Sequence, residues 1–132
     1  MQGQPGHSLP YTREELKMIQ RHVPNKWLIT LGTREAPTSV EKVLHELSNA
    51  SLAHFACHGT QDSSNPLASA LLLDKDKLKA SEIIRRRLPN ASLAFLSACE
   101  TAAGDEQTPD EVVHLSATLL FAGFRGVVGT MW

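Results

Sequence analysis

The chain has 132 residues, of which 42% are hydrophobic and 20% are charged. This is an ordinary globular composition, and a chain of this length can bury one core without disulfides. Thirteen basic and fourteen acidic residues leave a net charge of −1, so no overall field favours nucleic acid or an anionic membrane as a partner. The first eight residues lack the regions of a signal peptide, and no apolar run is long enough to cross a membrane. Two cysteines are too few for a disulfide scaffold, and we expect a cytoplasmic protein.

Helix and strand patterns alternate through the first half of the chain. A threonine with a glutamate three positions later, followed by apolar residues at helical spacing, predicts a helix over residues 12–23. A short strand is predicted over residues 27–31. A second capping-box pattern over residues 38–41 opens a helix, and residues 51–57 predict a further strand. The apolar stripe of that second helix is formed by Val40, Val43, Leu44 and Leu47.

The second half of the chain continues the alternation. Its pattern predicts a loop over residues 60–66, a hairpin over residues 71–78 and a helix over residues 81–88. A strand over residues 92–98, a helix over residues 108–122 and a strand over residues 127–132 follow. The strand over residues 92–98 is almost entirely apolar, which is typical of a strand covered on both faces. Alternating helices and apolar strands predict a mainly parallel sheet flanked by helices.

Two reactive side chains follow strands of this predicted sheet. His58 follows the strand over residues 51–57, and Cys99 follows the strand over residues 92–98. Ligands bind beyond the carboxyl ends of parallel strands, and neighbouring strands lie about 4.8 Å apart. If the two strands are neighbours, an imidazole and a thiol can share a reaction centre, with Gly59 and the turn after Cys99 offering N–H groups to an oxyanion. The competing interpretation is that Cys99 only packs in the core, as cysteines after apolar strands usually do.

The sequences around these two residues resemble a known family. His54–Gly59 (HFACHG) and Leu96–Thr101 (LSACET) are similar to the two signature segments of CHAT domains, which belong with caspases, separases, gingipains and legumains to one clan of cysteine peptidases. Further similar segments follow in the family's order, namely Asn65–Leu67, Ser69–Leu73, Leu78–Ile83 and Ala122–Trp132. The resemblance covers residues 9–132 and implies a three-layer, caspase-like α/β fold.

The resemblance also implies an activity and a set of site residues. It implies a cysteine endopeptidase that hydrolyses peptide bonds through a thioester, with His58 as the catalytic histidine and Cys99 as the nucleophile. Gly59 and Cys99 match the residues whose N–H groups form the oxyanion hole, and Glu100 and Thr101 either shape the nucleophile's turn or line the substrate pocket. The substrate would be a protein or peptide, and no metal or other cofactor is expected. The alternative is a catalytically silent regulatory or protein-interaction module, or an inactive fragment of the peptidase.

The ends of the chain carry a further expectation. Members of the family have a central strand before the segment seen here as Gln4-Pro5, continue past the last strand, and often adjoin tetratricopeptide-type repeats. We therefore expect residues 1–8 to be a disordered or remnant lead-in and residues 9–132 to be a partial domain that lacks elements at both ends. Such a domain would be marginally stable and would leave one edge of the strand over residues 51–57 unpaired.

Three other groups of residues have plainer interpretations. His54 lies within a predicted strand and is interpreted as a structural histidine. Cys57 is interpreted as a packing residue. The basic residues of the second half are interpreted as a solvated surface because acidic residues lie among them; they are Lys75, Lys77, Lys79, Arg85, Arg86 and Arg87.

Overall fold

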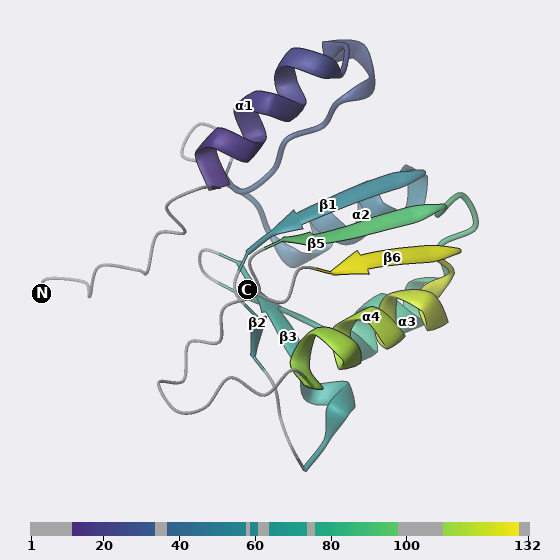
Figure 1. Cartoon of the computed structure of the whole chain (residues 1–132). Coiled ribbons are helices and arrows are strands. Elements are labelled where there is room, and N and C mark those ends of the chain that lie inside the picture. The colour runs from purple at the N-terminus through teal and green to yellow at the C-terminus, as the bar shows by residue number, and fades with distance from the viewer. Residues whose placement is uncertain are drawn as a thin grey trace, which may run out of the picture. The chain divides into compact units, whose positions relative to one another are not determined.

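The computed structural model describes residues 12–33, 37–57, 59–60, 64–73, 76–97 and 110–129. The chain divides into two compact units, Met1–Thr30 and Leu31–Trp132 (Figure 1). The expectation of a disordered lead-in over residues 1–8 falls outside the described residues. No described helix is long and apolar enough to cross a membrane.

The first unit contains the predicted helix but not the predicted strand. Helix α1 spans Thr12–His22, and the 3-10 helix η1 spans Asn25–Trp27. The strand predicted over residues 27–31 is wrong, although Leu28 is extended, with φ −112° and ψ 124°. An extended segment becomes a strand only when a neighbour completes its ladder of hydrogen bonds, and none of the described ladders includes these residues.

The second unit opens with helix α2, Val40–Asn49, as predicted. Its N-cap is Ser39, whose hydroxyl accepts a hydrogen bond from the Lys42 N–H at 3.3 Å. The cap therefore lies one residue later than the predicted capping box places it. The helix buries Leu44 and Leu47 in the core, which are two of the four residues in the predicted stripe.

The main sheet is parallel and has the order β1-β5-β6. Its strands are β1 (Leu52–Ala56), β5 (Leu93–Ser97) and β6 (Gly126–Gly129). β1 and β5 are direct neighbours, in a register that runs from Leu52 opposite Leu93 to Ala56 opposite Ser97. Among the described residues the ladder partner of β1 is β5.

A second, antiparallel sheet contains the predicted hairpin. It has the order β2-β3-β4, formed by β2 (Gly59–Thr60), β3 (Ala70–Leu72) and β4 (Lys77–Lys79). The 3-10 helix η2, Pro66–Ala68, lies between β2 and β3. β2 falls at the edge of the segment predicted as a loop, because a two-residue strand leaves no periodic pattern in the sequence.

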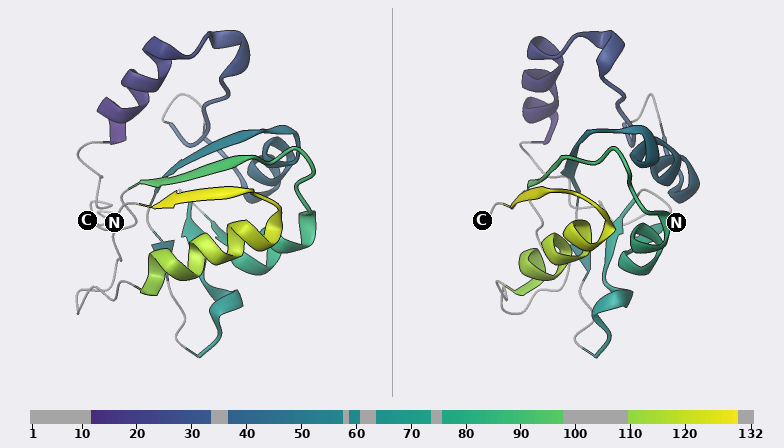
Figure 2. Two further views of the ribbon diagram at one scale, coloured as in Figure 1. Left: turned by 45° about the vertical axis from the view of Figure 1, so that its right-hand side comes forward. Right: turned by 90° about the vertical axis from the view of Figure 1, so that its right-hand side faces the viewer.

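Two further helices lie side by side against the main sheet (Figure 2). They are α3 (Ala80–Arg86) and α4 (Asp110–Ala122). One hydrophobic cluster joins them to α2 and to the sheet face that carries Ala94 and Leu96. Its buried members include Leu44, Leu47, Ile83, Leu88, Leu115 and Leu119. The α/β class with a mainly parallel sheet, predicted from the alternating pattern, is therefore confirmed.

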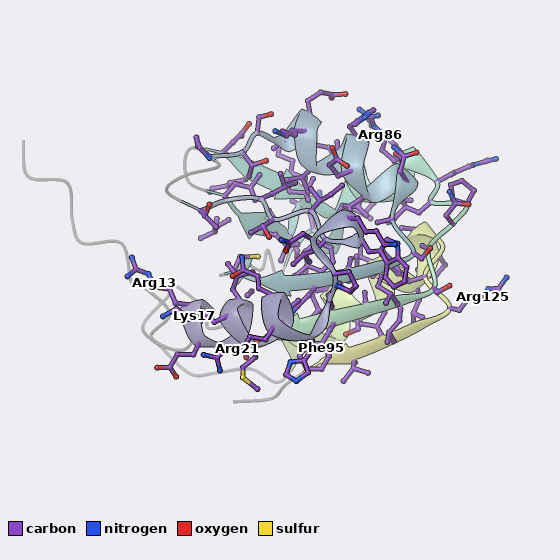
Figure 3. All side chains as sticks on the ribbon, turned by 90° about the horizontal axis from the view of Figure 1, so that it is seen from above. Arg13, Lys17, Arg21, Arg86, Phe95 and Arg125 are labelled. Atoms are coloured by element: carbon purple, nitrogen blue, oxygen red, sulfur yellow. The ribbon has the colours of Figure 1, made fainter. Side chains whose placement is uncertain are left out.

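The opposite face of the main sheet is more open than its apolar strands predict. Leu52, Leu93 and Val128 are 69%, 41% and 47% exposed. These residues alternate with the buried ones, since Ala94 and Leu96 of β5 are fully buried. Of the basic residues predicted to be surface, the described ones are exposed, and Figure 3 shows Arg86 and Arg125 reaching outward from the second unit.

Candidate active site

The carboxyl ends of β1 and β5 lie at the same edge of the main sheet. Their parallel register places Ala56 opposite Ser97, and His58 and Cys99 each follow these residues by two positions in the sequence. The condition set by the sequence analysis, that the two strands be neighbours, is therefore met. Ser97 is buried at this edge, 2% exposed.

His58, Cys99, Glu100 and Thr101 themselves lie outside the described residues. Their predicted roles therefore remain predictions, and of the candidate site residues Gly59 is the one that the structure describes. Among the described residues, no group of three or more His, Cys, Asp or Glu could hold a metal ion.

Gly59 is buried between two elements that are distant in the sequence. It belongs to β2 and stands opposite Leu71 of β3. A Cβ atom placed on Gly59 would lie 3.2 Å from Leu115 Cδ1 of α4 and 3.6 Å from the carbonyl oxygen of Ala70. The first of these distances is tighter than ordinary van der Waals contact, so glycine allows α4 to approach the backbone closely at this point.

Helix α4 is the first described element after the segment that contains Cys99. Its side chains Leu115, Thr118 and Leu119 are 4%, 8% and 1% exposed. The contact of Leu115 with Gly59 therefore joins the helix that follows the predicted nucleophile to the residue that follows the predicted histidine. Spacing along one helix does not reveal which distant residue a buried side chain of that helix contacts, so the sequence alone does not show this contact.

Two residues near the candidate site, His54 and Cys57, pack against neighbouring side chains. The rings of His54 and Phe95 lie opposite each other on β1 and β5, with centroids 5.1 Å apart in an edge-to-face arrangement. This contact agrees with the interpretation of His54 as a structural histidine. Cys57 is half-buried and packs against the core cluster, as the packing interpretation predicts.

Comparison with known proteins identifies the family. A family model described as "CHAT domain" matches residues 2–132, which is essentially the whole chain. No curated protein matches the sequence significantly.

Proposed function

We propose that this chain, which belongs to the CHAT domain family, is a cysteine endopeptidase in which Cys99 is the nucleophile and His58 the general acid and base. The family is related to the caspase-like cysteine peptidases. Family membership shows that the chain is related to these peptidases. The peptidase activity itself and the roles of Cys99 and His58 are what we propose. The substrate is a protein or peptide, and the reaction is hydrolysis of a peptide bond.

The register of β1 and β5 is the observation that carries this proposal. Ala56 and Ser97 are directly opposite each other, and parallel neighbours lie about 4.8 Å apart. Two residues of chain span at most about 7 Å, so the backbones of His58 and Cys99 each lie within about 7 Å of the paired residues Ala56 and Ser97 at the edge of the sheet. This edge is also where parallel α/β sheets bind ligands.

The proposed reaction has two steps. In the first, the Cys99 thiol gives its proton to His58, and the resulting thiolate attacks the carbonyl carbon of the scissile bond while the N–H groups of Gly59 and Cys99 donate to the oxyanion. The carbon–nitrogen bond then breaks, and protonated His58 gives its proton to the leaving amine. In the second, neutral His58 takes a proton from water as the water oxygen attacks the thioester carbon. The carbon–sulfur bond then breaks, the carboxylic acid is released, and His58 returns the proton to the Cys99 sulfur.

The closing experiment measures cleavage of a mixed peptide library by mass spectrometry. Cys99→Ala and His58→Ala should each lower the rate by at least about 10³-fold, because the residues of such a unit act together. Cys57→Ser is the matched control, since it removes the other thiol of the chain and should leave cleavage in place. Activity that survives Cys99→Ala would refute the proposal. A folded wild-type chain that cleaves no peptide would instead favour the silent regulatory or interaction module.

A further inference from the structure

The close approach of Leu115 to Gly59 connects helix α4 to a residue of the candidate site. Apart from the chain neighbours of Gly59, the described atoms within 4 Å of its Cβ position are Leu115 Cδ1 and the Ala70 oxygen. Leu115 is itself 4% exposed and belongs to the core cluster. It is therefore packed in the core and lies close to Gly59, with no room for a side chain between them.

The chain connections on either side of this contact suit it to a role in alignment. Gly59 is bonded directly to His58, so whatever fixes the Gly59 backbone limits where the imidazole can be placed. α4 follows the segment that contains Cys99, so its position fixes one end of that segment. Proton transfer between a thiol and an imidazole requires hydrogen-bond geometry, and a displacement of about 1 Å is enough to disrupt it.

We infer that Leu115 is a positioning residue, which holds the His58–Gly59 backbone against α4 so that the imidazole is aligned with the Cys99 thiol. This inference rests on the proposed function, because it supposes that the two residues form a dyad. The role inferred for Leu115 is an indirect one. It acts through Gly59, and its effect is on how readily the thiol loses its proton to His58.

Leu119 provides a matched control for Leu115. It is a leucine on the same helix, one turn later, and it is buried to the same degree, 1% against 4% exposed. No atom of Leu119 is among those described within 4 Å of the Gly59 Cβ position. Leu119→Ala therefore removes the same atoms from the same core without removing the contact with Gly59.

The test follows alkylation of Cys99 by iodoacetamide in the full chain carrying Cys57→Ser. The ratio of the rate at pH 6.5 to the rate at pH 9 is compared, because the thiolate is the species that reacts. A thiol is largely ionised at pH 9 without help, so the ratio isolates the contribution of His58 at pH 6.5. General loosening of the fold exposes the thiol at both pH values and leaves the ratio nearly unchanged.

His58→Ala should lower this ratio by about tenfold or more, as expected for a thiol that returns to its ordinary ionisation. Leu115→Ala should lower it by at least about fivefold, whereas Leu119→Ala should change it by less than about twofold. Leu115→Met, which keeps the volume, should restore the wild-type ratio. If Leu115→Ala does not fold, as judged by circular dichroism, Leu115→Val replaces it.

The two levels of the hypothesis fail differently. A ratio that His58→Ala leaves unchanged would overturn the proposed dyad. A ratio that falls in His58→Ala but is the same in Leu115→Ala and Leu119→Ala would overturn the inference about Leu115 alone. Gly59→Ala adds a final arm, because its new Cβ crowds Leu115. Its defect should be partly relieved when combined with Leu115→Ala, and strictly additive effects would show that the contact does not operate.

Discussion

Gly123 ends helix α4 in a conformation that an alanine cannot adopt without strain. Its φ is +129°, far from the values that residues with a side chain tolerate. The Gly123 N–H donates to the Leu120 carbonyl at 3.2 Å, and the Phe124 N–H donates to the Leu119 carbonyl at 3.1 Å. These two hydrogen bonds form a Schellman motif, and the glycine occupies the position at which that motif requires positive φ.

Gly123→Ala should therefore be strongly destabilising. The new Cβ would lie 2.7 Å from the carbonyl oxygen of Leu88. Leu88 cannot retreat easily, because its N–H donates to the Ala122 carbonyl at 3.0 Å and its side chain is buried. Backbone strain of this kind costs about 1–3 kcal/mol, and the steric contact adds to it. We expect a loss of about 3 kcal/mol and a fall in Tm of about 10 °C.

Urea unfolding followed by far-UV circular dichroism measures this loss, and Gly126→Ala is the control. A Cβ on Gly126 would lie 3.5 Å from Leu93 Cδ1, which is ordinary contact, and Gly126 is not among the glycines with positive φ. Gly126→Ala should therefore change the free energy of unfolding by less than about 1 kcal/mol. Equal unfolding midpoints for the two variants would refute the argument from the geometry of Gly123.

Three further predictions concern the second unit. Ser39→Ala should lower the free energy of unfolding by about 1 kcal/mol in a urea titration, because it removes the hydroxyl that accepts from the Lys42 N–H; no loss would mean that the cap is not formed. Leu78→Ala should cost about 3 kcal/mol in the same assay, since the side chain is 1% exposed; a loss below about 1 kcal/mol would contradict its burial. The ion pair between Arg86 and Glu41 should show a coupling of less than about 1 kcal/mol in a double-mutant cycle, and salt should weaken it, because the Glu41 side chain is 76% exposed. A larger coupling that salt leaves unchanged would contradict this view of the pair.

The sequence predicts well those elements whose signals are local. The capping pattern and apolar stripe of α2 predict both its start, to within one residue, and its buried leucines. The hairpin of β3 and β4 is predicted because leucines flank a polar turn over residues 74–77. The pairing of β1 with β5 could not be predicted from the sequence, because no local pattern specifies which strands become neighbours in the sheet.

The prediction of a strand over residues 27–31 fails for the same reason. Its residues, with sequence Trp-Leu-Ile-Thr-Leu, have a high preference for extended structure, and Leu28 is indeed extended. Extended backbone is nevertheless only half of a strand, because a ladder needs a second chain segment. The exposure of Leu93 has a similar origin. An apolar strand predicts that both of its faces are favourably buried, but the sequence of the strand does not show whether a second layer of the fold covers each face.

Two contacts of α4 imply that the stability of the fold and the alignment inferred for His58 and Cys99 should be coupled. The Leu88 N–H donates to the Ala122 carbonyl at the carboxyl end of the helix, and Leu115, about 12 Å before Gly123 along the helix axis, lies close to Gly59 of the candidate site. A helix behaves as a rigid body over this length, so a substitution that moves its carboxyl end also moves Leu115. Gly123→Ala should therefore lower the Cys99 alkylation ratio even in the fraction of molecules that stay folded, although it lies far from the sheet edge where His58 and Cys99 originate. Leu119→Ala, which removes core atoms without shifting the helix end, should not. A difference between these two variants at equal stability would separate displacement of α4 from simple loss of packing.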